Sequence, residues 1–244
     1  MANPILNENT FMEGNYTQIG TEVMTKEGVI TKTTGLLLLT TAVAAMAWFK
    51  VVSSPEAVMP LCLVGIIGAL ITKVAVAFKR NLAHYLAPLY ALFEGLAIGT
   101  ISCLMEAQFP GIVYQAVIGT FAVFFTVLAL YASRIIVVTQ KVRGVIMAAT
   151  VAVLIVYLGS FLLSLAGVKV PFMYDSSVLG IGLSIVVIII AASNFLIDFD
   201  NIEKGINHMA PKYYEWYSSF GLLVTLLWVY IEILKILARF ARRR

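Results

Sequence analysis

The most informative absence in this chain of 244 residues is charge. Asp, Glu, Lys and Arg make up 12% of the residues, and the hydrophobic set makes up 61%. An ordinary soluble domain has about 25% charged and about 45–50% apolar residues. The mean hydropathy is +0.94. This composition excludes a disordered chain, a nucleic-acid-binding domain and a standard cytosolic enzyme, and it predicts an integral membrane protein.

Cysteine and histidine are also scarce, with two of each in the chain. Cys62 and Cys103 lie in apolar runs without CxxC spacing, so we expect neither a disulfide framework nor a zinc site. His84 and His208 are expected in solvated positions. The chain also has no P-loop and no Ser/His/Asp set. We therefore expect no enzymatic activity and no cofactor.

Long apolar runs dominate the rest of the sequence. A helix needs about 20 mostly apolar residues to cross the hydrocarbon core, and continuous runs favour helices over a barrel. The runs that meet this requirement are approximately residues 33–49, 57–78, 84–105, 111–133, 144–167, 176–197 and 220–237. The sequence therefore predicts an all-α integral membrane protein with seven transmembrane helices.

The polar segments lie at the two ends of the chain. We divide it into a polar cytoplasmic leader (residues 1–32), a membrane domain (33–238) and a basic tail (239–244). The leader has mixed charge and no apolar core, so we expect no cleavable signal peptide.

The Lys and Arg residues of the short loops indicate the orientation. Most lie on the side of the N-terminus: Lys26, Lys32, Lys79, Arg80, Arg134, Lys141, Arg143, Lys204 and Lys212. The opposite loops contain Lys50 and Lys169, so the N-terminus is expected in the cytoplasm. The arginines at 242–244 run against this rule, because seven crossings place them outside. Either the tail is tolerated there or one segment does not cross, and we favour seven crossings.

Glu94 lies near the middle of the third apolar run. A charged residue at a helix centre costs roughly 2.5–3.5 kcal/mol on insertion scales, so such residues usually face an interior or a water path. Two interpretations stay open: Glu94 lies on an ion or proton path, or it is a protonated acid hydrogen-bonded between helices. Gly95 and Gly99 follow with GxxxG spacing, which permits close helix approach.

Glu232 and Lys73 are ionisable residues in two other apolar runs. Lys235 follows Glu232 by three residues, so an i,i+3 ion pair near the outer interface is one interpretation. The other is a buried carboxylate that meets another helix. Lys73 is expected to snorkel towards the inner interface.

An acidic cluster of Asp198, Asp200 and Glu203 ends the sixth run, where the helix dipole disfavours negative charge. One interpretation is a solvated helix end with Asp200 and Glu203 in water. Asp198 lies one residue past the apolar run, so it is expected to be partly buried. Two carboxylates that share a site cannot both ionise cheaply, which makes such a pair a candidate pH sensor or cation site. One carboxylate pair does not by itself select calcium.

Taken together, these residues make the chain resemble the Bax inhibitor family, also called the transmembrane Bax inhibitor motif family, and its bacterial branch in particular. The resemblance covers about residues 33–237 and the leader segment 3–7. It is carried by the segments FEGLAIG (93–99), IDFDNI (197–202) and VYIEIL (229–234). It implies a seven-helix bundle whose last helix is central, and a pH-sensitive calcium leak.

The resemblance also implies site residues. In the family an acid at the end of the sixth helix pairs with an acid in the seventh, and by motif these are Asp198 and Glu232. The second acid here is a glutamate where the family usually has an aspartate. Glu94 is the third candidate for the pH sensor and ion pathway. The secondary candidates are Asp200, Lys79 and Arg80. The permeating ion is expected to be calcium or another cation.

A second hypothesis makes the protein an interaction or regulatory protein of the membrane. Some members of the family are linked to cell death, stress responses or membrane proteolysis. The leader and residues 201–215 would then contact partner proteins, and the bundle would be a scaffold. Under either hypothesis the partners include the lipid bilayer and exclude nucleic acid. The expected location is a bacterial inner (plasma) membrane, with the endoplasmic reticulum as the alternative.

Overall fold

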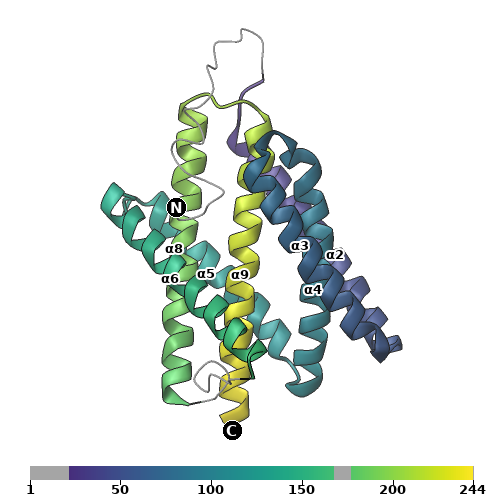
Figure 1. The fold of residues 1–244 in the computed structure, drawn as a ribbon. Coiled ribbons are helices and arrows are strands. Elements are labelled where there is room, and N and C mark those ends of the chain that lie inside the picture. The colour runs from purple at the N-terminus through teal and green to yellow at the C-terminus, as the bar shows by residue number, and fades with distance from the viewer. Residues whose placement is uncertain (1–21, 168–176, 244) are drawn as a thin grey trace. The chain divides into compact units, whose positions relative to one another are not determined.

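A computed structural model describes residues 22–167 and 177–243, and these residues are almost entirely helical (Figure 1). Within these two ranges, seven helices are long and apolar enough to cross a membrane. The only β-type pairing there is an isolated bridge between Val23 and Pro211. The structure therefore confirms the prediction of an all-α protein with seven membrane helices.

Each of the seven helices coincides with one of the predicted apolar runs to within a few residues at most ends, and residue 176, where the sixth run is predicted to begin, lies outside the described residues. The helices are α2 (Lys26–Ser53), α3 (Val58–Phe78), α4 (Ala83–Gln108), α5 (Ile112–Ala132), α6 (Gln140–Leu165), α8 (Val178–Asn207) and α9 (Tyr213–Arg243). Two short 3-10 helices, η1 (Pro55–Ala57) and η2 (Arg80–Leu82), lead into α3 and α4. Residues 26–32 of the predicted leader and 239–243 of the predicted tail are helical, because a helix continues through polar residues that an apolar run leaves out.

Local sequence signals explain where several helices begin. Thr25 caps α2, since its hydroxyl oxygen accepts a 3.0 Å hydrogen bond from the N–H of Gly28. Thr139 caps α6 in the same way. Such side chains satisfy N–H groups that have no partner within the helix. Gly111 precedes α5 with a φ of +85°, a left-handed conformation that glycine adopts without strain.

The chain forms two compact units, and α8 and α9 contribute to both. Of the described residues, the α2–α4 unit contains 22–110 and 201–224. The α5–α6 unit contains 111–167, 177–200 and 225–243. Each unit therefore has its own helices and its own part of the α8–α9 hairpin.

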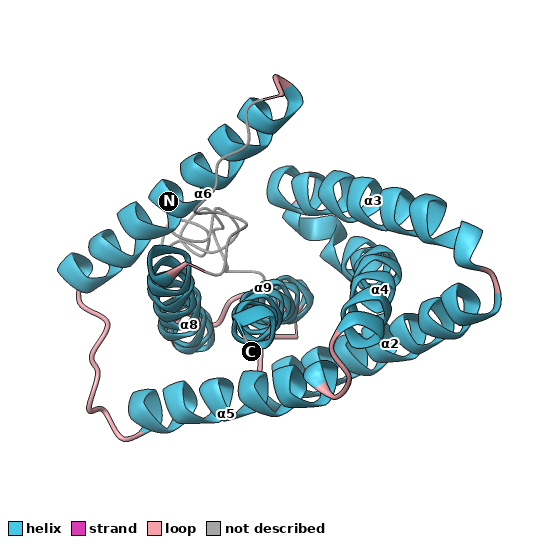
Figure 2. Ribbon diagram, turned by 90° about the horizontal axis from the view of Figure 1, so that it is seen from below, coloured by secondary structure: helices cyan, strands magenta, loops and turns pink. Residues whose placement is uncertain are grey.

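In the α2–α4 unit, α4 lies between α2 and α3 and packs against both (Figure 2). The contact with α2 is close at two glycines. A Cβ atom at Gly95 would lie 2.8 Å from the carbonyl oxygen of Thr40, and one at Gly99 would overlap the backbone of Ala44. The GxxxG spacing thus allows the close helix approach that the sequence predicts.

In the α5–α6 unit, aromatic and aliphatic side chains join the helices. Phe124 of α5 packs edge-on against Phe195 and Phe199 of α8, with ring centroids 5.2 and 5.8 Å apart, a favoured geometry for aromatic pairs. Ile146 of α6 packs with Leu196 and Ile197 of α8. These contacts hold the last third of α8 between α5 and α6.

The last helix, α9, is the most buried of the seven. In its most apolar stretch 78% of the residues are buried, compared with 11% in α6. In the α2–α4 unit, Ser219 donates a 3.0 Å hydrogen bond to the carbonyl of Val29 on α2. In the α5–α6 unit, Ile233 packs over Gly119 of α5. Other helices therefore cover α9 in each unit, as expected for a central last helix.

Candidate functional site

Asp198 lies on α8 and is completely buried, with 0% exposure. Its carboxylate accepts a 2.6 Å hydrogen bond from the hydroxyl of Thr225 on α9. Thr225 is itself buried. The structure thus places this predicted site residue between two membrane helices, with an uncharged hydroxyl group as a partner.

Glu232 lies on α9 and is 1% exposed. Its carboxylate accepts 2.9 Å hydrogen bonds from the hydroxyl of Tyr157 on α6 and from the ammonium group of Lys235. The indole N–H of Trp228 donates a third, at 3.3 Å. Both interpretations of this residue therefore apply, because Glu232 has its i,i+3 cation and also meets another helix.

The two predicted partners, Asp198 of α8 and Glu232 of α9, lie at different heights along the helix axes. Asp198 binds Thr225, which precedes Glu232 by seven residues. Seven helical residues span about 10 Å along the axis. Arg239, a further seven residues on, donates to the carbonyl oxygen of Gly180 near the start of α8. The antiparallel register of α8 and α9 therefore sets the two carboxylates about two turns apart.

Asp200 is not a solvated acid, and that interpretation of the helix end is wrong for this residue. Its side chain is 14% exposed and pairs with Arg143 on α6, whose side chain is 7% exposed. Arg143 is in the first turn of α6, where a positive charge is unfavourable for the helix dipole. The negative charge of Asp200 compensates it. Asp198 and Asp200 point to different helices, α9 and α6, because residues two apart lie on different helix faces.

Glu94 of α4 is half-buried and belongs to the α2–α4 unit. The hydroxyl of Tyr90, one turn earlier, donates a hydrogen bond to its carboxylate, and Lys73 of α3 provides an opposite charge. Lys73 is thus a counter-charge for Glu94, a role that the snorkelling expectation does not include. Glu94 therefore has both a hydrogen-bond donor and a cation at membrane depth.

Lys79 and Arg80, the secondary candidates, lie at the junction between α3 and α4. The N–H of Lys79 donates to the carbonyl of Ala75 and ends α3. The guanidinium group of Arg80 lies 5.9 Å from the ring centre of Tyr217 on α9. Both residues belong to the α2–α4 unit, whereas Asp198, Asp200 and Glu232 belong to the α5–α6 unit. The predicted residues therefore divide between two units.

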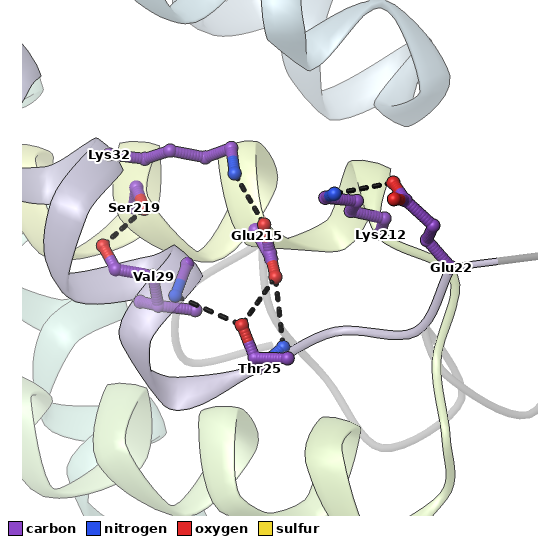
Figure 3. Close-up of polar contacts among 8 residues, drawn as sticks. Glu22, Thr25, Val29, Lys32, Lys212, Glu215 and Ser219 are labelled. Carbon is purple, nitrogen blue, oxygen red and sulfur yellow. Dashed lines mark hydrogen bonds and ion pairs between the residues drawn. The ribbon is translucent and has the colours of Figure 1, made fainter.

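A buried acid that sequence reasoning missed, Glu215, fastens the start of α2 to the start of α9 (Figure 3). Glu215 is 1% exposed. Its Oε1 atom accepts 2.9 Å hydrogen bonds from both the N–H and the hydroxyl of Thr25, and its Oε2 atom pairs with Lys32. Glu215 therefore caps α2 from a different helix.

The backbone around Glu215 adds further contacts between the same two segments. The N–H of Met24 donates to the carbonyl of Ala210 at 2.8 Å, and the N–H of Lys212 donates to the carbonyl of Glu22 at 2.9 Å. The side chains of Glu22 and Lys212 form an exposed ion pair, and this hydrogen bond raises the pKa of Lys212. We call residues 22–32 and 210–219 together the N-terminal clasp.

Two local signals were available for the clasp. Thr25 precedes the helix as a capping residue, and Glu215 lies in the first turn of α9, where negative charge is favoured. The residues are 190 positions apart, so neither signal identifies the other as its partner.

No group of three or more His, Cys, Asp or Glu side chains is placed to hold a metal ion among the residues that the structure describes. Calcium takes six to eight oxygen ligands. A cation at Asp198 would therefore draw most of its ligands from hydroxyl, backbone and water oxygens.

These helices and buried acids define a multi-pass membrane protein with ionisable groups at membrane depth. A family model described as Bax inhibitor 1 like matches residues 3–242. The chain therefore belongs to this family, which confirms the resemblance seen in the sequence. No curated protein and no solved structure matches the chain significantly.

Proposed function

We propose that the protein is a pH-sensitive leak pathway for calcium or other cations, gated by the protonation of Asp198 and Glu232. The observation that carries the proposal is the complete burial of Asp198 on a membrane helix, with the hydroxyl of Thr225 as a partner. Buried acids at membrane depth commonly mark ion or proton paths.

The chemistry of the contact between Asp198 and Thr225 explains how a proton would act. An ionised carboxylate only accepts hydrogen bonds, and its charge attracts a cation. A protonated carboxyl group has an O–H that needs an acceptor, and its remaining oxygen is a weaker acceptor for the hydroxyl of Thr225 than a carboxylate is. A proton thus removes the attraction for a cation and weakens the hydrogen bond that joins α8 to α9. Such a change can bias a helix pair between two arrangements.

Glu232 and Glu94 would act at other points of the pathway. Glu232 has Lys235 beside it, so its charge is compensated until that cation moves. Glu94 has Lys73 as its counter-charge. We assign Asp198 the gating role and Glu232 the second position of the carboxylate pair, and Glu94, in the α2–α4 unit, is a further candidate position. The proposal involves transport without catalysis.

Calcium flux into proteoliposomes loaded with a calcium-sensitive dye, measured between pH 5 and 8, tests the proposal. The unmodified protein should conduct, and its flux should change with pH. Asp198→Asn should remove most of the pH dependence of the flux, because an amide does not titrate in this range. Glu232→Gln should reduce the pH dependence.

The matched control is Glu27→Gln, which changes an exposed acid in the first turn of α2 and should leave flux and its pH profile unaltered. The mechanism is wrong when Asp198→Asn and Glu232→Gln also leave both unaltered. A purified protein that conducts at no pH in this range rejects the leak itself.

One observation favours the second candidate function, a membrane interaction protein in stress, cell-death or proteolytic regulation. The clasp brings residues 22–25 beside residues 210–212, so parts of the two predicted contact segments form one surface. Capture of partners by the full-length protein and by Glu215→Gln tests this. Loss of partners from Glu215→Gln without loss of flux would support the interaction function, and equal capture would reject it.

We propose that the protein resides in a bacterial inner membrane with its N-terminus in the cytoplasm. The asymmetry of Lys and Arg in the loops supports this orientation. A membrane-impermeant thiol reagent applied to intact cells should label Lys50→Cys and leave Lys141→Cys unlabelled. The reverse pattern would invert the orientation.

A further inference from the structure

Helix α6 is joined to α8 and α9 by three polar contacts that recur every seven residues. They are Arg143–Asp200, Thr150–Asn194 and Tyr157–Glu232. The amide of Asn194 donates to the hydroxyl of Thr150 at 2.9 Å. Seven residues make almost two complete turns, so the three α6 side chains lie on one face. We call these three contacts the polar ladder.

The polar ladder has little apolar packing to assist it. In its most apolar stretch α6 has the smallest buried share of the seven helices, 11%. Its buried residues besides Arg143 are Ile146, Val153 and Ser160. Lipid tails are as apolar as these side chains, so burial against protein gives no hydrophobic advantage inside a membrane. Close packing and polar contacts therefore hold α6 in place, and where few side chains are packed the polar contacts matter most.

The two ends of α6 are attached differently. The first end combines the ion pair of Arg143 with the apolar cluster of Ile146, Leu196 and Ile197. In the second half, residues 161–165 are all exposed, and Gly159 faces open space. The helix thus has an anchored start and a weakly held end.

The contact at Tyr157 holds the second half over Glu232. The hydroxyl of Tyr157 donates a hydrogen bond to Glu232. In addition, the ammonium group of Lys235 lies at a distance of 4.6 Å from the centre of the Tyr157 ring, which is a cation–π arrangement. Removal of Tyr157 from this position would uncover Glu232, which is 1% exposed, whereas Lys235 is already exposed.

We infer that α6 is a lateral gate, whose second half, residues 150–165, swings away from α8 and α9 about the anchored start. Thr150 and Tyr157 are the positioning residues that keep it closed, and opening uncovers Glu232. The inference rests on the proposed function, since the route that the gate opens is the proposed cation path.

The variant Thr150→Val with Tyr157→Phe removes two ladder contacts at nearly constant volume. The partner groups keep other hydrogen bonds, so the fold is expected to persist. Asn194 also donates to the carbonyl of Ile190 at 2.8 Å, and Glu232 retains Trp228 and Lys235. The matched control is Thr126→Val with Tyr114→Phe, which makes the same changes at exposed positions of α5.

Spin labels on Leu158→Cys and Val186→Cys measure the gate directly by double electron–electron resonance in lipid nanodiscs. Both positions are exposed, on α6 and α8, and the native Cys62 and Cys103 are replaced by Ala. We expect a short and a long distance population. Each interhelical hydrogen bond in a membrane favours the closed form by a factor of about three, so the double variant should raise the long-to-short ratio roughly ninefold. The control variant should match the unmodified protein.

Calcium flux of the same proteins separates this inference from the proposed function. Identical distance distributions in the unmodified protein and the double variant overturn the gate, whatever the flux. Changed distances with an unchanged flux, in a protein that conducts, also overturn it. Changed distances in a protein that conducts at no pH establish the movement and reject the leak alone. A parallel rise in the long population and in flux supports both.

Discussion

The hydroxyl of Thr225 on α9 donates a 2.6 Å hydrogen bond to the carboxylate of Asp198 on α8, where the acid is entirely shielded from solvent. This contact fixes the register of the α8–α9 hairpin in the last third of α8. It also leaves Glu232 two turns further along α9, where its partners come from α6 and from α9 itself. Asp198 therefore joins α8 to α9, whereas Glu232 joins α6 to α9.

Thr225→Val should lower the stability of the protein by about 1.5–3 kcal/mol, the usual contribution of a hydrogen bond to a charged group. The change keeps the side-chain volume and removes a donor to a buried carboxylate. Thermal unfolding in detergent measures the effect. Thr126→Val is the control, because that exposed hydroxyl donates only to the carbonyl of Ala122 on its own helix among the contacts described. Equal melting temperatures for the two variants would contradict the prediction.

Arg143→Met should destabilise the protein by up to about 3–5 kcal/mol, since it removes the arginine that compensates the largely shielded charge of Asp200. The double variant Arg143→Met with Asp200→Leu should recover most of this loss, because it removes both charges. A double variant as unstable as Arg143→Met alone would show that the ion pair is not the cause.

The ion pair of Lys212 and Glu22 is far more exposed than that of Arg143 and Asp200. Its side chains are 49% and 74% exposed, and exposed pairs contribute little to stability. Lys212→Met should therefore leave the melting temperature unchanged within measurement error. A loss comparable to that of Arg143→Met would mean that the clasp depends on this pair.

Gly28→Ala should destabilise the protein even though alanine favours a helix by about 1 kcal/mol over glycine. A Cβ atom at this position would overlap the carboxylate of Glu215. That carboxylate can move only by giving up its bonds to Thr25 and Lys32. Gly35→Ala on the same helix is the control. Nothing lies within 4 Å of a Cβ atom there, so this change should raise the melting temperature. Melting temperatures that shift in the same direction in both variants would contradict the clasp geometry.

Gly99→Ala should cost about 1–3 kcal/mol, the usual penalty for overpacking. A new Cβ atom would meet the backbone of Ala44, which cannot rotate away as a side chain can, so α2 and α4 would have to separate. Gly159→Ala on α6 faces open space and should have no such cost. Thermal unfolding of the two variants in the same detergent measures the difference.

The seven helices could be predicted from sequence because a lipid environment leaves few alternatives. Every backbone polar group at membrane depth must be bonded within the protein, so a long apolar run forms a helix. The ion pair between Glu232 and Lys235 could be predicted for a similar reason, since residues three apart are neighbours on any helix. Both predictions depend only on local geometry.

The partners of the buried acids could not be predicted in this way. Asp200 meets Arg143 across 57 positions, and Arg143 looks like an ordinary cytoplasmic loop charge in the sequence. Asp198 meets a threonine and Glu232 a tyrosine, and nothing separates these hydroxyl groups from the many others in the chain. The resemblance to the family implies that Asp198 pairs with Glu232, and this pairing stays a prediction. In the structure the two acids accept hydrogen bonds from different hydroxyl groups, those of Thr225 and Tyr157.

The seven-residue spacing of the polar ladder limits how the length of α6 can change. One residue inserted between Arg143 and Thr150 would turn the rest of the helix by about 100°. Thr150 and Tyr157 would then face lipid, and Asn194 and Glu232 would each lose a partner. Insertion or removal of seven residues would preserve the direction of these side chains but shift them by about 10 Å. The segment between the first and last contacts of α6 is thus fixed in length.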